Sequence, residues 1–168
     1  GYNILKNSID VSDVSRVVEQ IKNIDLSDLS NPILLSEEVG SYASKIGVIQ
    51  EVRDCLNSYF RDSILKVGSA VVDGRDIGTV VFPNADIKMY VTAKVEIRAE
   101  RRFKQLQNAG KSIIYEDVLE DLKIRDERDS SRKVAPLKPA SDAIYIDTSD
   151  LDASSVLNLA VSLSSALV

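Results

Sequence analysis

Most apolar residues in the chain recur every three or four positions, which is the spacing of amphipathic helices. After a start signal at residues 10–13, this spacing predicts one helix, and Ser36 followed by two glutamates predicts the start of another. The second stretch weakens near residues 47–51, which indicates two helices joined there. Further helices are predicted at residues 94–109, 115–129 and 151–168. We expect the Leu and Val pattern of the last helix to be part of the core.

Short apolar runs between the helices predict strands. They occupy residues 70–72, 86–91 and 143–146. Strands that alternate with helices are typical of a parallel sheet with crossover helices, so we expect an α/β fold. Residues 23–35 mix Asp, Ser, Asn and Pro with scattered Leu and Ile, and this composition predicts a loop.

The composition narrows the possible chemistry. The 168 residues fit a single domain, and no apolar run approaches the ~20 residues that span a membrane. The chain has no histidine and a single cysteine, Cys55, which excludes histidine-based catalysis, a disulfide framework and a cysteine-rich metal site. We expect Cys55 to be a small core residue. Because the net charge is −5, any anion site must be a local cluster of arginines rather than a property of the whole surface.

One candidate cluster follows the first predicted strand, in the segment Gly74–Thr79 with the sequence GRDIGT. Ligands of open α/β sheets bind beyond the carboxyl ends of strands, so Arg75 and Asp76 are placed for recognition. The alternative is a tight turn that carries an ordinary ion pair.

A second candidate cluster occupies residues 125–132, with the sequence RDERDSSR. On a helix, Arg125, Asp129 and Arg132 continue a stripe of apolar residues, so the apolar face runs into arginines. A bound anion would relieve the repulsion between Arg128 and Arg132, and the arginine fork suits phosphate. The alternative is a solvated helix of mixed charge, because acidic residues nearly neutralise this segment.

The helix at 94–109 carries three more arginines. They are Arg98, Arg101 and Arg102. Most of them are expected to pair with Glu96 and Glu100, and one of them could contact a ligand.

Three phrases of the sequence together resemble bacterial cytidylate kinase, a nucleoside monophosphate kinase of the P-loop type. They are VVDGRDIGTVVFPNADIKMYVTA, IRAERRFKQLQNAGK and IRDERDSSRKVAPLKPASDAIYIDTS. The match runs from about residue 36 to residue 150, and the phrases GRDIGTVVFP and RDERDSSRKVAPL are specific to this family among kinases. The resemblance implies a three-layer α/β fold, in which helices flank a parallel sheet.

The resemblance also implies a reaction. Members of the family transfer the γ-phosphoryl group of ATP, with Mg²⁺, to CMP or dCMP. They have one kinase domain, expected here over residues 1–168, with a monophosphate-binding segment at about 22–50 and a mobile lid at about 123–139. Phosphoryl transfer depends on positioning and charge neutralisation more than on a proton shuttle, which suits clustered arginines in a chain without histidine.

Family roles carry over to the matching positions of this sequence. The residues expected to bind the substrate are Ser44, Arg53 and Asp76 at the cytosine ring, Asp129 at the ribose and Arg75 near the phosphates. The arginines expected to be catalytic, by neutralising phosphate charge, are Arg125, Arg128 and Arg132. Arg101 is expected to bind ATP, and no residue is expected to bind a metal directly.

Two departures from the family pattern affect these expectations. The segment 23–35 is shorter than in many members, so the edge of the monophosphate pocket is expected to differ. The family opens with a strand, a G-x-x-x-x-G-K-S/T loop and a helix, and the resemblance here starts after them. Gly110–Ser112 does not replace that loop, because position 105 is Gln, and Gly110 is expected to end a helix instead. We therefore expect the 168 residues to form an N-terminally incomplete fold that is catalytically inactive.

Alternative interpretations are a nucleotide-binding fragment without catalysis and a kinase that prefers UMP. Asp76, Ser44 and Arg53 argue against AMP as the substrate. No signal-peptide pattern opens the chain, so we expect a cytoplasmic protein. We also expect it to be a monomer. Its expected partners are CMP, dCMP and ATP rather than nucleic acid or a membrane.

Overall fold

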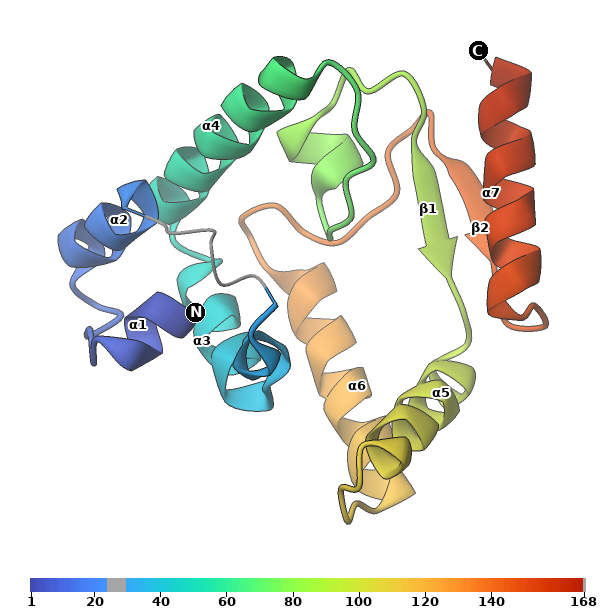
Figure 1. Ribbon diagram of the computed structural model, residues 1–168, viewed down its shortest axis with the longest axis horizontal. Helices are drawn as coiled ribbons and strands as arrows, with labels where there is room; N and C mark the ends of the chain where they lie inside the picture. The colour runs from blue at the N-terminus through green and yellow to red at the C-terminus, as the bar shows by residue number, and fades with distance from the viewer. Residues whose placement is uncertain (24–29, 168) are drawn as a thin grey trace. The chain divides into compact units, whose positions relative to one another are not determined.

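The computed structural model describes residues 1–23 and 30–167 (Figure 1). The chain divides into two compact units, Gly1–Val72 and Asp73–Val168. The expected kinase domain over residues 1–168, with its binding segment and lid, stays a prediction. Within the described residues, no helix combines the length and the apolar character that crossing a bilayer requires.

The first unit is built from helices. They are α1 (Tyr2–Lys6), α2 (Val14–Lys22), the 3₁₀ turn η1 (Pro32–Leu35), α3 (Glu37–Ile46) and α4 (Gln50–Val67). The predicted helix starts are confirmed. The Asp13 carboxylate accepts a hydrogen bond from the Arg16 amide at 3.1 Å, and the Ser36 hydroxyl accepts one from the Val39 amide at 3.3 Å. The predicted junction between two helices is also confirmed, between α3 and α4.

An apolar core holds these helices together. Its buried members are Ile4, Ile9, Val17, Ile21, Ile46 and Val52. Cys55 packs against this core as a half-buried residue, which agrees with the structural role expected for it. Of the predicted loop at 23–35, residues 24–29 lie outside the described part, and η1 forms at its end.

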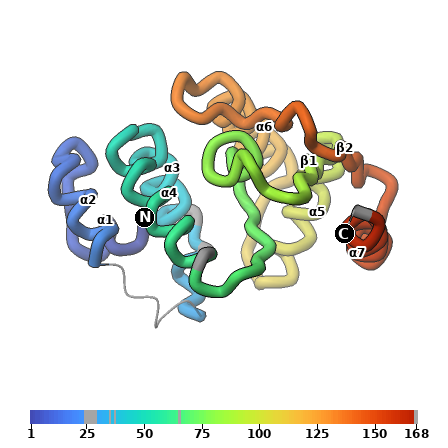
Figure 2. Tube along the Cα trace, turned by 90° about the horizontal axis from the view of Figure 1, so that it is seen from above, coloured from blue at the N-terminus to red at the C-terminus, as the bar shows by residue number. Residues whose placement is uncertain are grey.

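The second unit combines a small parallel sheet with helices. Its elements are the π-helical turn η2 (Ile77–Val81), β1 (Met89–Thr92), α5 (Val95–Asn108), α6 (Tyr115–Ser131), β2 (Ile144–Asp147) and α7 (Ala153–Leu167). Strands β1 and β2 lie side by side in Figures 1 and 2 and pair in parallel, with Met89 opposite Ile144. Helices α5 and α6 separate the two strands in the sequence. The expectation of an α/β fold with parallel strands is therefore confirmed.

The strand predicted at residues 70–72 is wrong. This segment has no regular secondary structure, and Val71 is fully exposed. A strand is stabilised by hydrogen bonds to a neighbouring strand, and within the described residues the sheet consists of β1 and β2. The GRDIGT segment therefore follows an irregular stretch rather than a strand. The described residues form a small two-stranded sheet, so the three-layer arrangement stays a prediction.

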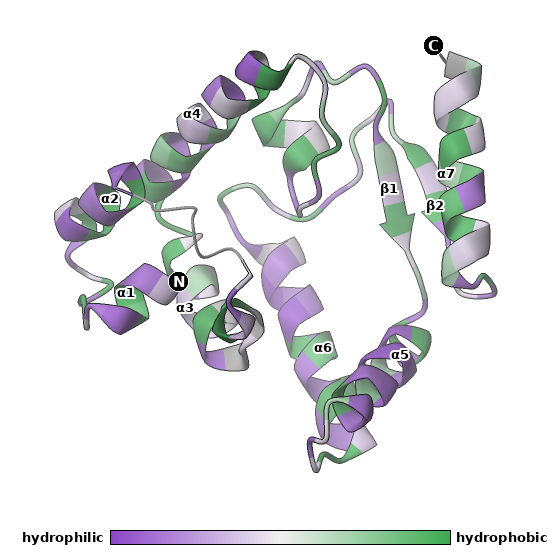
Figure 3. Cartoon of the chain, viewed as in Figure 1, coloured by the Kyte–Doolittle hydropathy of each residue, from purple (hydrophilic) through white to green (hydrophobic). Residues whose placement is uncertain are grey.

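Helices α5 and α6 pack against each other through a second apolar cluster. Ala99, Leu106 and Val118 are its buried members, and Phe103 and Leu122 pack against it. The remaining surface of both helices is predominantly hydrophilic (Figure 3). After α5, Gly110 adopts a φ of +74°, a conformation that favours glycine, so its predicted role at a helix end is confirmed.

The prediction that the last helix is a core element is not met in the described structure. Leu157, Leu159 and Val161 of α7 are all exposed, although apolar residues run along the helix (Figure 3). The pattern of Leu and Val indicates a helix correctly. Burial also needs a partner element, and the residues of one helix do not specify that partner.

Candidate functional site

Arg75 and Asp76 are held in a tight bend that ends in a short π-helix. The Asp76 carbonyl oxygen accepts hydrogen bonds from the amides of Thr79 and Val80, at 3.3 and 2.9 Å, which closes the bend. A Cβ at Gly74 would lie 2.8 Å from the Ile77 side chain, so a larger residue there would force that side chain to shift. The bend leaves the Asp76 side chain buried and the Arg75 side chain partly exposed.

Asp129 is the buried acceptor at the centre of one arginine cluster. One of its carboxylate oxygens lies 3.1 Å from Arg75 Nε and 3.8 Å from Arg125 Nε. Its backbone carbonyl accepts a hydrogen bond of 2.7 Å from the Leu137 amide, which ties α6 to the segment after it. Two residues from the predicted clusters, Arg75 and Asp129, are thus brought together from 54 positions apart in the sequence.

Arg132 lies beside the second buried carboxylate. It follows the last residue of α6, so the expected continuous helical stripe ends before it. Its Nε donates a hydrogen bond of 2.5 Å to the Ala135 carbonyl, and Ala135 adopts an unusual positive φ of +49°. Its Nη2 is buried without a hydrogen-bond partner, and the nearest Asp76 oxygen is 3.9 Å away. Arg132 and Asp76 therefore form a close charge pair with an unused hydrogen-bond donor.

Like charges lie close together in this arginine cluster. Burial lowers the pKa of Arg125, and repulsion from Arg75 and then Arg128 lowers it further, while Asp129 opposes the shift. The arginines therefore repel one another despite the neighbouring carboxylate. An anion such as phosphate would remove that repulsion and could accept hydrogen bonds from several guanidinium groups at once.

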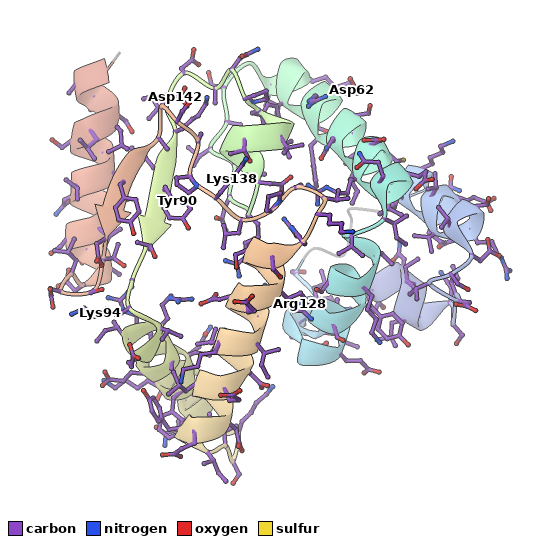
Figure 4. All side chains as sticks on the ribbon, turned by 180° about the vertical axis from the view of Figure 1, so that it is seen from behind. Asp62, Tyr90, Lys94, Arg128, Lys138 and Asp142 are labelled. Carbon is purple, nitrogen blue, oxygen red and sulfur yellow. The ribbon has the colours of Figure 1, made fainter. Side chains whose placement is uncertain are left out.

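Arg128 lies on the C-terminal half of α6, and Lys138 lies on the segment beyond it (Figure 4). Arg128 is exposed, and it contributes to the repulsion that acts on Arg125. It is therefore close enough to the cluster to add to its positive potential.

The three arginines of α5 have partners other than those predicted. Arg98 donates to the Asp126 carboxylate, Arg101 donates to Thr148 and to the Leu151 carbonyl, and Arg102 donates to Gln105. The expected pairing with Glu96 and Glu100 is wrong, and Glu100 instead pairs with Lys104. Local spacing suggested pairs within one helix, whereas two of these arginines reach other elements.

Arg101 lies close to the carboxyl end of β2. Its Nη2 donates to the carbonyls of Thr148 and Leu151 at 2.6 and 2.9 Å, and its Nη1 donates to the Thr148 hydroxyl at 3.1 Å. These bonds fix the start of α7 to the middle of α5.

Ser44 and Arg53 belong to the first unit. Arg53 Nη1 donates a hydrogen bond of 3.1 Å to the carbonyl of Gly47, the residue that caps α3. Ser44 is half-buried in the last turns of α3. Both residues therefore lie near the junction of α3 and α4, and their expected place at the same base as Asp76 stays a prediction.

Sequence reasoning missed two long-range ion pairs that support the second unit. Lys88 pairs with Asp142 at 2.7 Å, and Arg98 pairs with Asp126 at 2.7 Å. The partners are 54 and 28 positions apart. No periodic pattern relates residues at such separations, so the sequence carried no signal for either pair.

Comparisons with known proteins agree with these features. The family described as Cytidylate kinase matches residues 1–165 of the chain. A cytidylate kinase of Rickettsia bellii is 46% identical over 157 residues, which cover 94% of this chain and 71% of the relative. The cytidylate kinases of Rickettsia canadensis and Rickettsia felis are 46% and 45% identical, cover 93% and 94% of the chain, and are each covered over 71% of their length. With its paired arginine and carboxylate clusters and this extent of similarity, the chain belongs to the cytidylate kinase family.

Proposed function

We propose that the protein transfers the γ-phosphoryl group of ATP to CMP or dCMP, with ADP and CDP or dCDP as products. The observation that carries this proposal is the arginine cluster around Asp76 and Asp129, in a chain of the cytidylate kinase family. In the reaction, a phosphate oxygen of CMP forms a bond to the γ-phosphorus. The bond between that phosphorus and the bridging oxygen of ADP breaks. No residue has to act as a nucleophile, so charge stabilisation by arginines is the main demand on the protein.

The lid arginines supply that charge stabilisation. Arg125, Arg128 and Arg132 neutralise the phosphates during transfer, and Arg75 assists them. The buried Nη2 of Arg132, which has no hydrogen-bond partner, supports this role because a phosphate oxygen could accept its hydrogen bond.

The two buried carboxylates bind the nucleoside part of the substrate. Asp76, with Ser44 and Arg53, recognises the cytosine ring, and Asp129 holds the ribose. A carboxylate can accept a hydrogen bond from the exocyclic amino group of cytosine. Uracil has an oxygen at that position, so the same contact disfavours UMP.

Arg101 binds ATP in this proposal. Support comes from its place beside Thr148 and Leu151, after the carboxyl end of β2, because ligands of α/β sheets bind beyond such ends. A Mg²⁺ ion bound with ATP would add to the charge neutralisation that the arginines provide. Within the described residues, no three His, Cys, Asp or Glu side chains gather to hold a metal ion. We propose that the chain acts on the ion through the nucleotide that it holds, because Mg²⁺ is bound largely by substrate phosphates and water.

The test is an assay of ADP release by the complete protein with MgATP and either CMP, dCMP, UMP or AMP. We expect kcat/KM to be highest for CMP or dCMP. Arg125→Gln should lower kcat/KM for CMP at least about a hundredfold, because it removes a preorganised charge at the phosphates. The exposed neighbour Lys133 provides the control variant Lys133→Gln, which should stay within about twofold. Preference for UMP, or full activity of Arg125→Gln, would contradict the proposal.

The 168 residues contain no G-x-x-x-x-G-K-S/T sequence. The backbone amides and lysine of such a loop hold the β- and γ-phosphates in P-loop kinases. We therefore propose that a polypeptide of residues 1–168 alone does not transfer phosphate. Turnover by that polypeptide within about tenfold of the complete protein would mean that the ATP site lies elsewhere. Cytoplasmic location and a monomeric state also stay proposals.

A further inference from the structure

Arg98 joins three elements of the second unit through a single guanidinium group. Its Nε donates a hydrogen bond of 2.9 Å to the carbonyl of Ala93, just after β1. Its Nη1 and Nη2 donate to the two carboxylate oxygens of Asp126 on α6, at 3.0 and 2.7 Å. This is a bidentate pair, which fixes direction as well as distance. The first turn of α5, the end of β1 and the second half of α6 are thereby connected.

The second half of α6 has little other support from α5. The apolar contact between the helices includes Val118 and Leu122 in the first half of α6. The next apolar residue, Ile124, is 56% exposed and does not belong to this cluster. The first half of α6 therefore contacts α5 through apolar side chains, and the second half contacts it through the polar pair of Arg98 and Asp126.

The pair of Arg98 and Asp126 lies close to two residues of the arginine cluster on α6. Asp126 follows Arg125 directly and precedes Asp129 by nearly one helical turn. Residues within one turn of a helix keep a fixed orientation relative to one another about the helix axis. A contact that fixes the orientation of Asp126 therefore also fixes the orientations of Arg125 and Asp129. Asp129 also pairs at 3.1 Å with Arg75, which lies outside α6, so a small rotation of this half-helix would disturb that pair.

We propose that Arg98 and Asp126 are positioning residues that hold the second half of α6, so that Arg125 and Asp129 meet the substrate in a productive orientation. This inference rests on the function proposed above. Neither residue touches the reacting atoms. Their effect is on the geometry of the lid arginines, where a displacement of about 1 Å can reduce the rate substantially.

The test compares Asp126→Asn, Arg98→Lys and the double variant in the complete protein. Asparagine keeps the size of the side chain but loses the charge, and lysine keeps the charge but loses the fork. We expect each single variant to lower kcat for CMP about tenfold, with KM for ATP within about twofold. The two residues act as one pair, so losing both should cost little more than losing one. The kcat of the double variant should therefore lie within about threefold of the kcat of either single variant.

The matched control is Glu100→Gln. It removes an exposed ion pair with Lys104 on the same helix α5 and should leave kcat within about twofold. Hydrogen exchange of residues 123–131 should be faster in Asp126→Asn than in the unaltered protein, and unchanged in Glu100→Gln.

Three outcomes would overturn the proposal. The first is a folded Asp126→Asn protein with unchanged kcat, even if its melting temperature falls, because that pattern indicates a purely structural pair. The second is a double variant whose loss of kcat equals the product of the losses in the two single variants. The third is unchanged exchange at 123–131 in Asp126→Asn. If the unaltered protein phosphorylates none of the four monophosphates, the proposed function fails, and the exchange measurement still decides whether the pair holds this half-helix.

Discussion

The guanidinium of Arg132 is the residue-level feature that most strongly indicates a missing partner. A buried arginine nitrogen normally has a hydrogen-bond acceptor, because burial of an unsatisfied charged donor is costly. Arg132 Nη2 has none, and Asp76 lies 3.9 Å away, beyond hydrogen-bond distance. Asp76 is itself buried, so the unsatisfied donor of Arg132 faces a buried carboxylate, and a phosphate oxygen could accept its hydrogen bond.

Asp76 should therefore determine nucleobase affinity. We expect Asp76→Asn to weaken CMP binding about tenfold to a hundredfold, because a hydrogen bond to a charged acceptor contributes ~1.5–3 kcal/mol. ATP affinity should change less than about threefold. Calorimetric titration of the complete protein with each nucleotide measures both effects.

Asp73 provides the control for this variant, since it is exposed and close in the sequence. Asp73→Asn should bind CMP as the unaltered protein does. An unchanged Kd for CMP in a folded Asp76→Asn protein would remove Asp76 from the base pocket.

At the scale of elements, a lysine with a buried side chain connects the segments that lead into the two parallel strands. The Lys88 ammonium group, with only 8% of its side chain exposed, donates to the Pro83 carbonyl at 2.5 Å and to both oxygens of Asp142. Its aliphatic stem passes 3.3 Å from where a Cβ of Gly78 would stand, so it also packs on the π-helical turn. Asp142 lies at the end of the sheet opposite Lys94 (Figure 4). Lys88 thus connects the GRDIGT bend, the start of β1 and the entry to β2.

This contact predicts an acid-sensitive contribution to stability. The hydrogen bond from Lys88 lowers the pKa of Asp142 below its usual value of 3.8. A carboxylate whose pKa is lowered by folding stabilises the protein above that value and loses this effect as the pH falls through the lowered pKa. Asp142→Asn should therefore lower the free energy of unfolding at neutral pH, and the difference from the unaltered protein should shrink below pH 3.8.

Urea denaturation across this pH range measures the difference. The exposed Asp86 supplies the comparison, and Asp86→Asn should have little effect at any pH. A deficit in Asp142→Asn that is as large in acid as at neutral pH would show that the charge of Asp142 is not the cause.

At the scale of the whole molecule, the sequence predicted local features well. Helix starts at Asp13 and Ser36 and the glycine after α5 were predictable because they depend on residues within one turn of each other. The failures concern distant partners. The segment 70–72 had the composition of a strand but no neighbouring strand, and α7 had the pattern of a buried helix but an exposed surface.

In the candidate site, too, the local features were predictable from the sequence and the long-range contacts were not. The two clusters were predictable because each is a short run of charged residues. Their joining through Arg75 and Asp129 was not, since the sequence alone gives no distance between residues 54 positions apart. The pairing of Arg98 with Asp126 was hidden for the same reason.

The proposed lid leads to a prediction about motion. Residues 123–139 carry a dense set of arginines, and repulsion among Arg75, Arg125 and Arg128 disfavours a fixed arrangement without an anion. We expect amide hydrogen exchange in this segment to slow when CMP and a non-hydrolysable ATP analogue bind together. The adjacent helix α5, held by its apolar contact with α6, should change much less.

Mass spectrometry of peptides from the complete protein, with and without the two nucleotides, measures this effect. Inorganic phosphate alone is the comparison that separates simple charge neutralisation from closure around substrate. Exchange at 123–139 that does not respond to saturating nucleotides would contradict a lid role for this segment.

The way in which arginines are anchored here affects how freely the sequence can evolve. Arg53, Arg98, Arg101 and Arg132 each donate to a main-chain carbonyl, at Gly47, Ala93, Leu151 and Ala135 among others. A carbonyl is present whichever side chain its residue carries, so many substitutions at an acceptor such as Leu151 leave the hydrogen bond in place. Neutral drift can therefore alter the residues around these arginines while their placement persists. Selection then acts mainly on the arginines themselves, where a single codon change removes the contact.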